Sequence, residues 1–305
     1  MKLLEGISPP LVTPLLPDGS LDEPGLRRLI DYVIDGGVHG IVVLGSSGEA
    51  ALLLPEVRRR VVEVAVDQAG RRVPVVVGTG EPGTALAVQS TRLAQQAGAA
   101  GAIVVPPFYY PHDQEAVKRH YRTLRDEVGL PLLAYHIPGM TKVPVEADTL
   151  LELAADGTLV GMKDSAGSFA YYQRIVDGTR DNPRFAALQG SDQFLFAGLH
   201  YGGDGAISVI SQVAPKIMVA LYDAARASDW DEARRLHAQW QRVSAAIGPG
   251  WIPAIKGAFS ALGICGPHVA APNATWSEDR LTAQRTRVLE MREQGLLEPR
   301  VPVAA

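Results

Sequence analysis

Short apolar runs alternate along this chain with longer stretches in which apolar residues recur every three or four positions. The alternation repeats about once every 25 to 30 residues, which is typical of βα units in a parallel sheet. We therefore expect eight strands, at residues 7–12, 40–44, 73–78, 101–105, 130–135, 159–163, 185–189 and 205–209.

The amphipathic stretches between these runs predict helices at residues 23–35, 55–69, 84–97, 114–128 and 147–155. Pro55 suits the first turn of a helix, and glycines that suit a helix end follow at Gly98, Gly129 and Gly157. Eight strands that are each followed by a helix favour a closed (β/α)8 TIM barrel of the α/β class, because closure leaves no unprotected strand edge. A doubly wound open sheet fits less well, since no GxGxxG motif follows a strand.

Helical periodicity continues after the eighth unit, at residues 230–246, 252–262 and 278–294. We expect these segments to form a C-terminal helical appendix. The chain then divides into a catalytic (β/α)8 barrel at residues 1–228 and a helical region at residues 229–305 that packs on the barrel. The Gly-rich and Pro-rich joints between the helical segments are too short to be flexible linkers.

Composition and charge narrow the class of function. Hydrophobic residues make up 47% and charged residues 20% of the 305 residues, as in an ordinary globular protein. The formal net charge of -4 does not favour binding to nucleic acid. Short basic clusters such as Arg58 to Arg60 are expected on solvated helix faces. The sequence shows no apolar signal segment, and no apolar run approaches the roughly 18 residues that span a bilayer. We expect a cytoplasmic protein with neither a membrane nor a nucleic-acid partner.

The cysteine and histidine residues give no support for a disulfide or a metal site. The single cysteine, Cys265, excludes an internal disulfide and lies in the apolar context LGICGP, which favours a buried structural thiol over a nucleophile. The seven histidines form no HxH or HExxH pair, so the sequence predicts no metal ligand set.

Lys163 is the first candidate for chemistry, because the catalytic groups of a TIM barrel lie at the C-terminal ends of its strands. It ends the predicted strand TLVGMK, and strand alternation places it on the same face as Leu159 and Gly161. Gly161 leaves room inside the barrel mouth, where burial disfavours the ammonium form and makes the free amine available to attack a carbonyl. From position alone two alternatives stay open: a structural lysine paired with Asp164, or a lysine that extends out of the barrel.

Two further strand ends carry polar side chains. Tyr135 ends the fifth strand on the same face as Leu133, and its phenol could carry protons in an imine reaction; a core tyrosine with a satisfied hydroxyl is the alternative. Ser46 and Ser47 lie in the loop GSSG at residues 45–48, which offers hydroxyls and unhindered N–H groups to a carboxylate. Alone, such a loop is more often a plain turn or a phosphate loop.

Six motifs follow one another at the strand ends: GSSGEAALL, PVVVGTG, VVPPFYYP, YHIPG, LVGMKDSAG and GDGAISV. Together they resemble the dihydrodipicolinate synthase / N-acetylneuraminate lyase superfamily, a group of class I aldolase-like barrels, over nearly the whole chain. Any one motif could arise by chance, whereas six in register are specific. In this resemblance Lys163 matches the lysine that forms an imine with pyruvate or another 2-oxo acid.

The resemblance implies roles for other residues as well. Tyr135 matches a proton-shuttling tyrosine, and Ser46 and Ser47 match the hydroxyl pair that holds the 2-oxo acid carboxylate, with Ser46 also passing protons. Tyr109 matches a tyrosine that completes this relay from a neighbouring subunit, which implies a homodimer at least and usually a homotetramer, a dimer of dimers. Positions that line the substrate channel are matched by Gly190, Ile207 and Ser208. The partners implied are a 2-oxo acid and an aldehyde, with no metal and no other cofactor.

One motif departs from the synthases of this superfamily and leaves the substrate open. Their motif reads like YNVPxRT, whereas this chain has His136 in place of the asparagine and Met140 in place of the arginine that grips the second substrate's carboxylate. A thioether cannot replace a bidentate guanidinium. The leading prediction is an aldolase or retro-aldolase for a 2-oxo-3-deoxy sugar acid or related 4-hydroxy-2-oxo acid. The alternatives are a dihydrodipicolinate synthase with an altered carboxylate clamp, a deoxy sugar acid dehydratase, and a non-catalytic 2-oxo-acid sensor.

Overall fold

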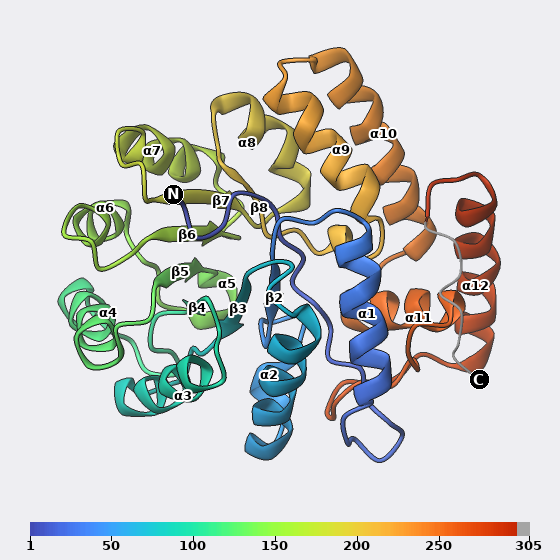
Figure 1. Ribbon diagram of the computed structural model, residues 1–305, viewed down its shortest axis with the longest axis horizontal. Helices are drawn as coiled ribbons and strands as arrows, with labels where there is room; N and C mark the ends of the chain where they lie inside the picture. The colour runs from blue at the N-terminus through green and yellow to red at the C-terminus, as the bar shows by residue number, and fades with distance from the viewer. Residues whose placement is uncertain (298–305) are drawn as a thin grey trace.

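The computed structural model describes residues 1–297, so residues 298–305 of the expected helical region lie outside the described residues. In the described part, eight parallel strands follow the order β1-β8-β7-β6-β5-β4-β3-β2, with helices around them (Figure 1). A bridge between Pro10 and Val42 joins the two end strands, and the Leu11 amide donates to the Val42 carbonyl over 2.8 Å. The sheet thus closes into the expected (β/α)8 TIM barrel.

The strands lie where the apolar runs predict them, but each is shorter than its predicted range. They are β1 (Gly6–Ile7), β2 (Ile41–Val43), β3 (Val75–Gly78), β4 (Gly101–Val104), β5 (Leu132–His136), β6 (Gly161–Asp164), β7 (Ala186–Gln189) and β8 (Gly205–Ala206). β1 is shortened most, because Pro9 and Pro10 follow it and a proline has no N–H to donate to a ladder.

The helices of the barrel are α1 (Glu23–Asp35), α2 (Pro55–Ala69), α3 (Thr84–Gln96), α4 (Gln114–Val128), α5 (Pro138–Thr141), α6 (Ala147–Ala155), α7 (Phe169–Thr179), α8 (Leu195–Tyr201) and α9 (Pro215–Arg226). Five of them, α1, α2, α3, α4 and α6, match their predicted ranges closely, and the four others had no predicted range. α4 shows why: the Asp113 carboxylate accepts a hydrogen bond from the Ala116 N–H at 2.7 Å, and Gly129 ends the helix with a φ of 73°. Side-chain capping and a left-handed glycine are both signals that the sequence displays.

The interior of the barrel is filled by one cluster of buried side chains. Its members come from inward-facing strand positions and from the segment before β1: Leu4, Val42, Val76, Ile103, Leu133, Tyr135, Ala186, Leu188 and Ile207. A second, larger cluster packs the outer face of the strands against the helices. Because the interior is packed, the barrel is not a pore, and ligands of such a fold bind at its mouth.

Three helices follow the barrel: α10 (Trp230–Ile247), α11 (Ile252–Leu262) and α12 (Glu278–Glu293). They lie beside α9 and α1 on one side of the barrel (Figure 1). Tyr32 of α1 and Phe259 of α11 make an edge-to-face ring contact with centroids 6.4 Å apart. α10 packs directly on α9, so the division of the chain at residue 228 stays a prediction.

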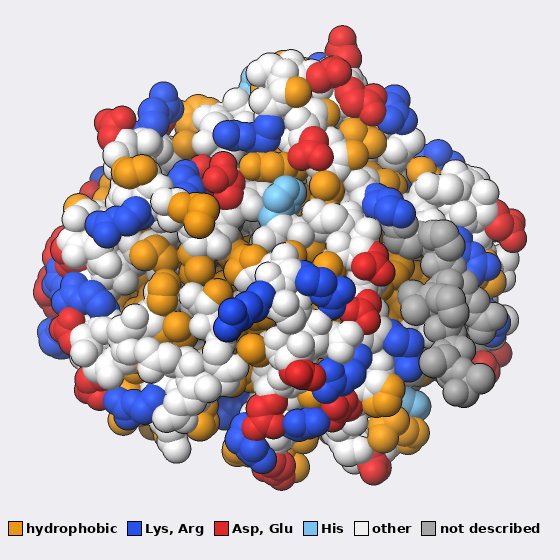
Figure 2. Space-filling view, in the orientation of Figure 1, with side chains coloured by type: hydrophobic (Ala, Val, Ile, Leu, Met, Phe, Trp, Pro, Cys, Tyr) orange, Lys and Arg blue, Asp and Glu red, His pale blue; other side chains and the backbone are white. Residues whose placement is uncertain are grey.

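The surface carries mixed charge. Figure 2 shows acidic and basic side chains interspersed around the rim of the molecule, in keeping with the net charge of -4. Within residues 1–297, no helix is both long and apolar enough to cross a membrane. Cys265 is buried, as its apolar sequence context predicts, and burial raises the pKa of its thiol to about 12.

Candidate active site

β5 and β6 bring Tyr135 and Lys163 together at the barrel mouth. The two residues are register partners in adjacent parallel strands, and both side chains point to the barrel interior. The Lys163 ammonium nitrogen, Nζ, lies 4.2 Å from the centroid of the Tyr135 ring. Lys163 is 5% and Tyr135 6% exposed, so a carbonyl that reaches the amine also meets the phenol away from bulk water.

The surroundings of Lys163 decide between the alternatives left by the sequence. Asp164 points to the other face of β6, where its Oδ1 lies 2.9 Å from Nδ1 of His136. No ion pair links Lys163 to any acidic side chain of the described residues. The lysine therefore is not a structural partner of Asp164, and its low exposure shows that it does not extend out of the barrel.

Gly190, after β7, makes the space that Lys163 occupies. A Cβ atom at this position would lie 2.8 Å from Cε of Lys163 and 2.2 Å from Oγ of Ser165. Real Cβ atoms do not come so close, so any side chain here would displace the lysine or the serine. Gly190 was expected beside the substrate channel from the family resemblance; it lies against the lysine itself.

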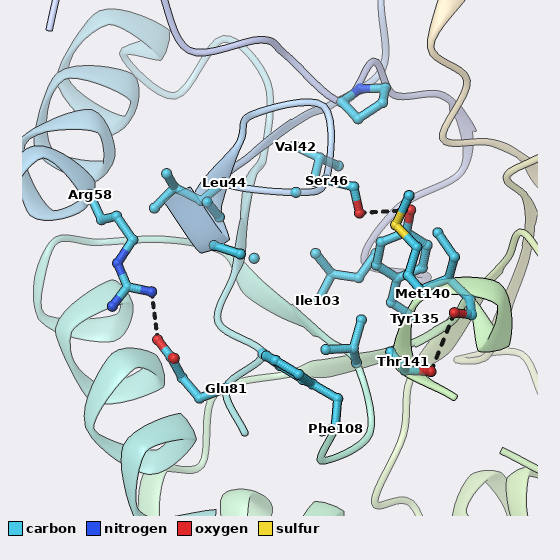
Figure 3. Close-up of a pocket in the computed structure, with 18 of the residues that line it drawn as sticks. Val42, Leu44, Ser46, Arg58, Glu81, Ile103, Phe108, Tyr135, Met140 and Thr141 are labelled. Carbon is cyan, nitrogen blue, oxygen red and sulfur yellow. Dashed lines mark hydrogen bonds and ion pairs between the residues drawn. The ribbon is translucent and has the colours of Figure 1, made fainter. Parts of the chain in front are cut away.

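The loop after β2 brings Ser46 to the same site. Its Oγ donates to the Tyr135 hydroxyl at 3.4 Å (Figure 3). The loop is held in a tight turn, since Leu44 and Glu49 at its two ends both adopt a φ of 57°. The Thr13 hydroxyl also donates to the carbonyl of Gly48 at 2.7 Å. This support fixes the position of Ser46 relative to the phenol.

The charge state of Tyr135 depends on these neighbours. Burial raises the pKa of the phenol. The Lys163 charge and the hydrogen bond from Ser46 lower it and together outweigh the effect of burial, so the pKa lies below its ordinary value of 10.0. A phenol whose anion is stabilised in this way can give up a proton and take it back more readily than an isolated tyrosine.

A cavity of about 480 Å³ opens over these residues, and Lys163, Tyr135, Ser46 and Met140 all line it. Figure 3 shows Met140 near Tyr135 on one side of the cavity, and an ion pair on the opposite side. That ion pair joins Arg58 of α2 to Glu81 over 2.6 Å. Phe108, after β4, completes the wall between the two sides.

Five predicted site residues do not line this cavity, and Gly190, which packs against Lys163, is one of them. Ile207 is buried in the barrel interior, and Ser47 is buried within its loop. The Ser208 hydroxyl donates to Oδ1 of Asp192 at 2.5 Å. Burial raises the pKa of that carboxyl, while the Ser208 hydrogen bond and the Lys163 charge oppose the rise. Tyr109 lies on the surface, so its proposed relay to Ser46 stays a prediction.

Tyr109 has an unusual conformation. It is 82% exposed, and its φ of 80° is in the left-handed region, which bulky residues seldom adopt. Its ring meets that of Tyr110 edge to face, with centroids 5.0 Å apart. The backbone thus holds two exposed aromatic rings away from the body of this chain.

Arg58, Glu81 and Phe108 line the cavity but were not predicted as site residues from the sequence. Arg58 was expected on a solvated helix face with its neighbours; instead it lies in the cavity wall because α2 turns this one position toward Glu81. Helical periodicity could have placed Arg58 on a different face of α2 from Arg59, which is exposed. Glu81 lies in a loop, where no periodic pattern predicts the direction of a side chain. Among the described residues, no group of three or more His, Cys, Asp or Glu side chains is placed to hold a metal ion.

A buried lysine at the mouth of a TIM barrel, with no acidic partner within residues 1–297, suits the class of lyases that react through an amine-carbonyl imine. Comparison with known proteins agrees. The family model described as the Dihydrodipicolinate synthetase family matches residues 3–290. The chain therefore belongs to the dihydrodipicolinate synthetase family, and it is a carbon-carbon or carbon-oxygen lyase of class I.

Individual relatives support the assignment. An uncharacterized DapA-like lyase of Halobacterium salinarum is 40% identical over 263 residues, which cover 86% of this chain and 85% of the relative. A 4-hydroxy-tetrahydrodipicolinate synthase of Phenylobacterium zucineum is 38% identical over 299 residues, covering 97% of this chain and 99% of the relative. The crystal structure of YagE, a prophage protein of the dihydrodipicolinic acid synthase family from E. coli K12 in complex with pyruvate, is similar with a TM-score of 0.89. It is 33% identical and covers 96% of this chain and 99% of that chain.

Proposed function

We propose that the protein is an aldolase or retro-aldolase that joins pyruvate to an uncharged aldehyde, or cleaves the product, a 2-oxo-3-deoxy sugar acid or related 4-hydroxy-2-oxo acid. The Lys163 amine attacks C2 of pyruvate, and loss of water from the carbinolamine gives the imine. The imine withdraws electrons from C3, which loses a proton to give an enamine. The enamine carbon then bonds to the aldehyde carbon, the aldehyde oxygen takes up a proton, and water hydrolyses the imine to release the product.

The residues around Lys163 are assigned roles in these steps. Tyr135, close to both the amine and Ser46, carries protons to and from the carbinolamine and the aldehyde oxygen. Ser46 and Ser47 hold the pyruvate carboxylate, and Ser46 passes protons to Tyr135. Gly190 keeps space for the lysine, while Ile207 and Ser208 support the channel beside it. Lys163 supplies the electron sink in this scheme, so no metal or other cofactor is invoked.

The observation that carries the choice of aldehyde is that, among the described residues that line the cavity, no free cation lies opposite Lys163. Met140 lines the cavity at the position of the synthases' arginine, and the guanidinium of Arg58 is already engaged by Glu81. A carboxylate on the aldehyde would meet neither a bidentate partner nor an unpaired charge there. An uncharged aldehyde has no such requirement.

The synthase of 4-hydroxy-tetrahydrodipicolinate is the second candidate, because relatives such as that of Phenylobacterium zucineum carry this name. A deoxy sugar acid dehydratase would use the same imine and differ in the bond that breaks. A non-catalytic sensor is disfavoured, since a sensor needs the carboxylate loop but not the paired lysine and phenol.

The proposed partners are pyruvate or another 2-oxo acid, an aldehyde, and further copies of this chain. YagE, which is similar over nearly its whole length, is described in complex with pyruvate. Exposed Tyr109 favours a shared site in a homodimer or a homotetramer. The cytoplasmic location expected from the sequence stays a prediction.

The substrate choice is tested by comparing aspartate semialdehyde with glyceraldehyde as acceptors for pyruvate. Loss of one partner of a buried charge-assisted pair costs about 2 to 5 kcal/mol, or roughly 30-fold to several-thousand-fold in discrimination. We expect kcat/KM of the wild type to favour glyceraldehyde, and Met140→Arg to shift the ratio toward the semialdehyde. Met140→Leu is the matched control, since it changes shape without adding charge. A wild type that prefers the semialdehyde at least about tenfold would favour the synthase.

A further inference from the structure

A second cavity of about 390 Å³ adjoins the catalytic cavity. The two share Ser46, Ala50, Ala51 and Met140 in their walls, so they lie next to each other on either side of these residues. The second cavity extends from the loop after β2 to the C-terminal region, where Trp251 and Asn273 line it. It has no role in the reaction steps described above.

Trp251 is presented to this cavity by a strained backbone. Its φ and ψ are 46° and -111°, a combination that a bulky L residue seldom adopts. The preceding Gly250 has a φ of 128°, and a Cβ there would lie 2.6 Å from the ring of Trp276. α11 begins directly afterwards, with the Ile255 amide donating to the Trp251 carbonyl at 2.9 Å. The turn is thus fixed on both sides, and the indole remains 40% exposed over the opening.

The wall of the second cavity is mainly apolar. Besides Trp251 and Met140 it includes Ala50, Ala51, Leu52, Ile252, Pro253 and Ala274. Its one carboxylate, Glu49, is already engaged: Oε2 lies 2.5 Å from Nζ of Lys256, and Oε1 accepts from the Ala270 amide at 2.8 Å. Among the described lining residues there is no lysine or arginine. A charged group would therefore gain no partner there, whereas a flat apolar group would bury its surface against the indole and the thioether.

We infer that the second cavity is the subsite for the distal end of the aldehyde, and that it takes an aryl or branched-alkyl group. The inference rests on the proposed function, and it narrows the product to a 4-hydroxy-2-oxo acid that carries an apolar substituent. With C2 of pyruvate bound to Lys163, the new carbon-carbon bond forms in the catalytic cavity, and the substituent of the aldehyde extends past Met140. A two- or three-carbon aldehyde has no atoms that reach Trp251, so the subsite discriminates by the size and polarity of this substituent.

The test measures kcat/KM for benzaldehyde and acetaldehyde with pyruvate as the common donor. One methylene in an apolar pocket changes discrimination about 10- to 200-fold, so the wild type should favour benzaldehyde at least about tenfold. Trp251→Ala should lower the benzaldehyde-to-acetaldehyde ratio about tenfold or more, mainly through the KM for benzaldehyde. Trp251→Phe keeps a ring and should retain most of the preference. Trp230→Ala, which removes an indole from the distant N-terminus of α10, is the matched control.

The possible outcomes separate the subsite from the reaction. If the wild type shows no preference for benzaldehyde, or if Trp251→Ala lowers kcat/KM equally for both aldehydes, the proposed subsite is contradicted but the proposed aldolase activity is not. A preference for benzaldehyde that disappears in Trp230→Ala would assign the effect to stability and likewise overturn the inference. If no aldehyde is converted and pyruvate forms no adduct with the enzyme, the proposed function itself has failed.

Discussion

Two lysines of this chain are buried, and their surroundings differ in the way that matters for reactivity. Lys256 is fully buried, pairs with Glu49 and donates to the carbonyl of His268 at 2.7 Å. Lys163 has no acidic partner among the described residues and faces a cavity beside a phenol. Burial alone is therefore no guide to the imine-forming residue. An unpaired amine at the strand ends of a TIM barrel is the feature that distinguishes it.

The lowered pKa of Tyr135 gives a prediction at the same scale. Tyr135 should ionise below pH 10.0, and Ser46→Ala should move this ionisation to higher pH, because the lost hydrogen bond stabilises the phenolate. The measurement is the tyrosinate absorbance of each protein minus that of its Tyr135→Phe counterpart. Burial raises the pKa of Tyr121, Tyr171 and Tyr172 well above this range, so their signals do not interfere.

The control for this titration is Ser47→Ala, which removes a hydroxyl from the next position of the same loop. An equal rise of the Tyr135 pKa in Ser47→Ala, or an unchanged Tyr135 pKa in Ser46→Ala, would contradict the coupling between Ser46 and Tyr135. The alkaline limb of kcat/KM should move in the same direction as the absorbance if Tyr135 is the proton carrier.

At the scale of elements, the buried pair of Glu49 and Lys256 ties the loop after β2 to α11. Glu49 ends the loop that carries Ser46, and Lys256 lies in the middle of α11. Glu49 also accepts from Asn273 at 3.3 Å, so both α11 and the loop that follows it contact this carboxylate. The C-terminal helices therefore help to hold the catalytic loop, in addition to covering one side of the barrel.

Breaking this pair should destabilise the protein strongly. Lys256→Met leaves the buried Glu49 carboxylate without its cationic partner, which costs about 3 to 5 kcal/mol. Replacing both residues, as Lys256→Met with Glu49→Gln, should recover part of the loss, since no unpaired charge remains. Urea denaturation measures both. Arg59→Ala, which breaks a surface pair with Glu63, is the control and should cost no more than about 1 kcal/mol. If Lys256→Met lowers the free energy of unfolding no more than Arg59→Ala does, the pair of Glu49 and Lys256 does not hold the loop.

The sequence predicts some elements better than others, for physical reasons. α1, α2, α4 and α6 have the ends that the apolar periodicity predicts. An aspartate side chain caps the first turn of α1 and of α4, and α2 begins with Pro55 and ends at Gly70. β1 and β8 are shorter than their apolar runs because hydrophobicity reports burial, whereas a ladder also needs N–H donors and an adjacent strand. Apolar residues after β8 instead lead into the 3-10 turn Ile210–Gln212.

The same distinction applies to the site. Strand alternation was sufficient to place Lys163 and Tyr135 on one interior face, and the register of β5 and β6 makes them neighbours. Trp251 could not be found in this way, because it lies about 200 residues from Ser46 along the chain and reaches the site through a turn with no periodic pattern. The clue in the sequence was the joint at Gly248 to Gly250, which supplies positive φ angles.

At the scale of the whole molecule, Tyr109 and Tyr110 are the aromatic residues most exposed in the described chain. A strained φ that holds Tyr109 away from its own body is explained if the ring inserts into a second copy. Mixing inactive Tyr109→Phe chains with inactive Lys163→Ala chains should then restore partial activity. In a mixed dimer, one of the two sites combines an intact lysine with an intact tyrosine from the partner.

The control for mixing is each variant incubated alone under the same exchange conditions, which should stay inactive. Mass measurement of differently tagged chains establishes that mixed dimers have formed. Absence of recovery in such mixed dimers would show that Tyr109 acts within its own subunit or has no part in the reaction.

The central claim is that Lys163 forms the imine, and borohydride trapping with pyruvate tests it most directly. Reduction should attach one pyruvate-derived group per chain, and peptide mass spectrometry should locate it on Lys163. Lys163→Ala should lose both the adduct and all turnover, whereas Lys142→Ala, which removes an exposed lysine beside Met140, should keep the adduct. An adduct on Lys142 or Lys256, or an adduct that persists in Lys163→Ala, would contradict the account.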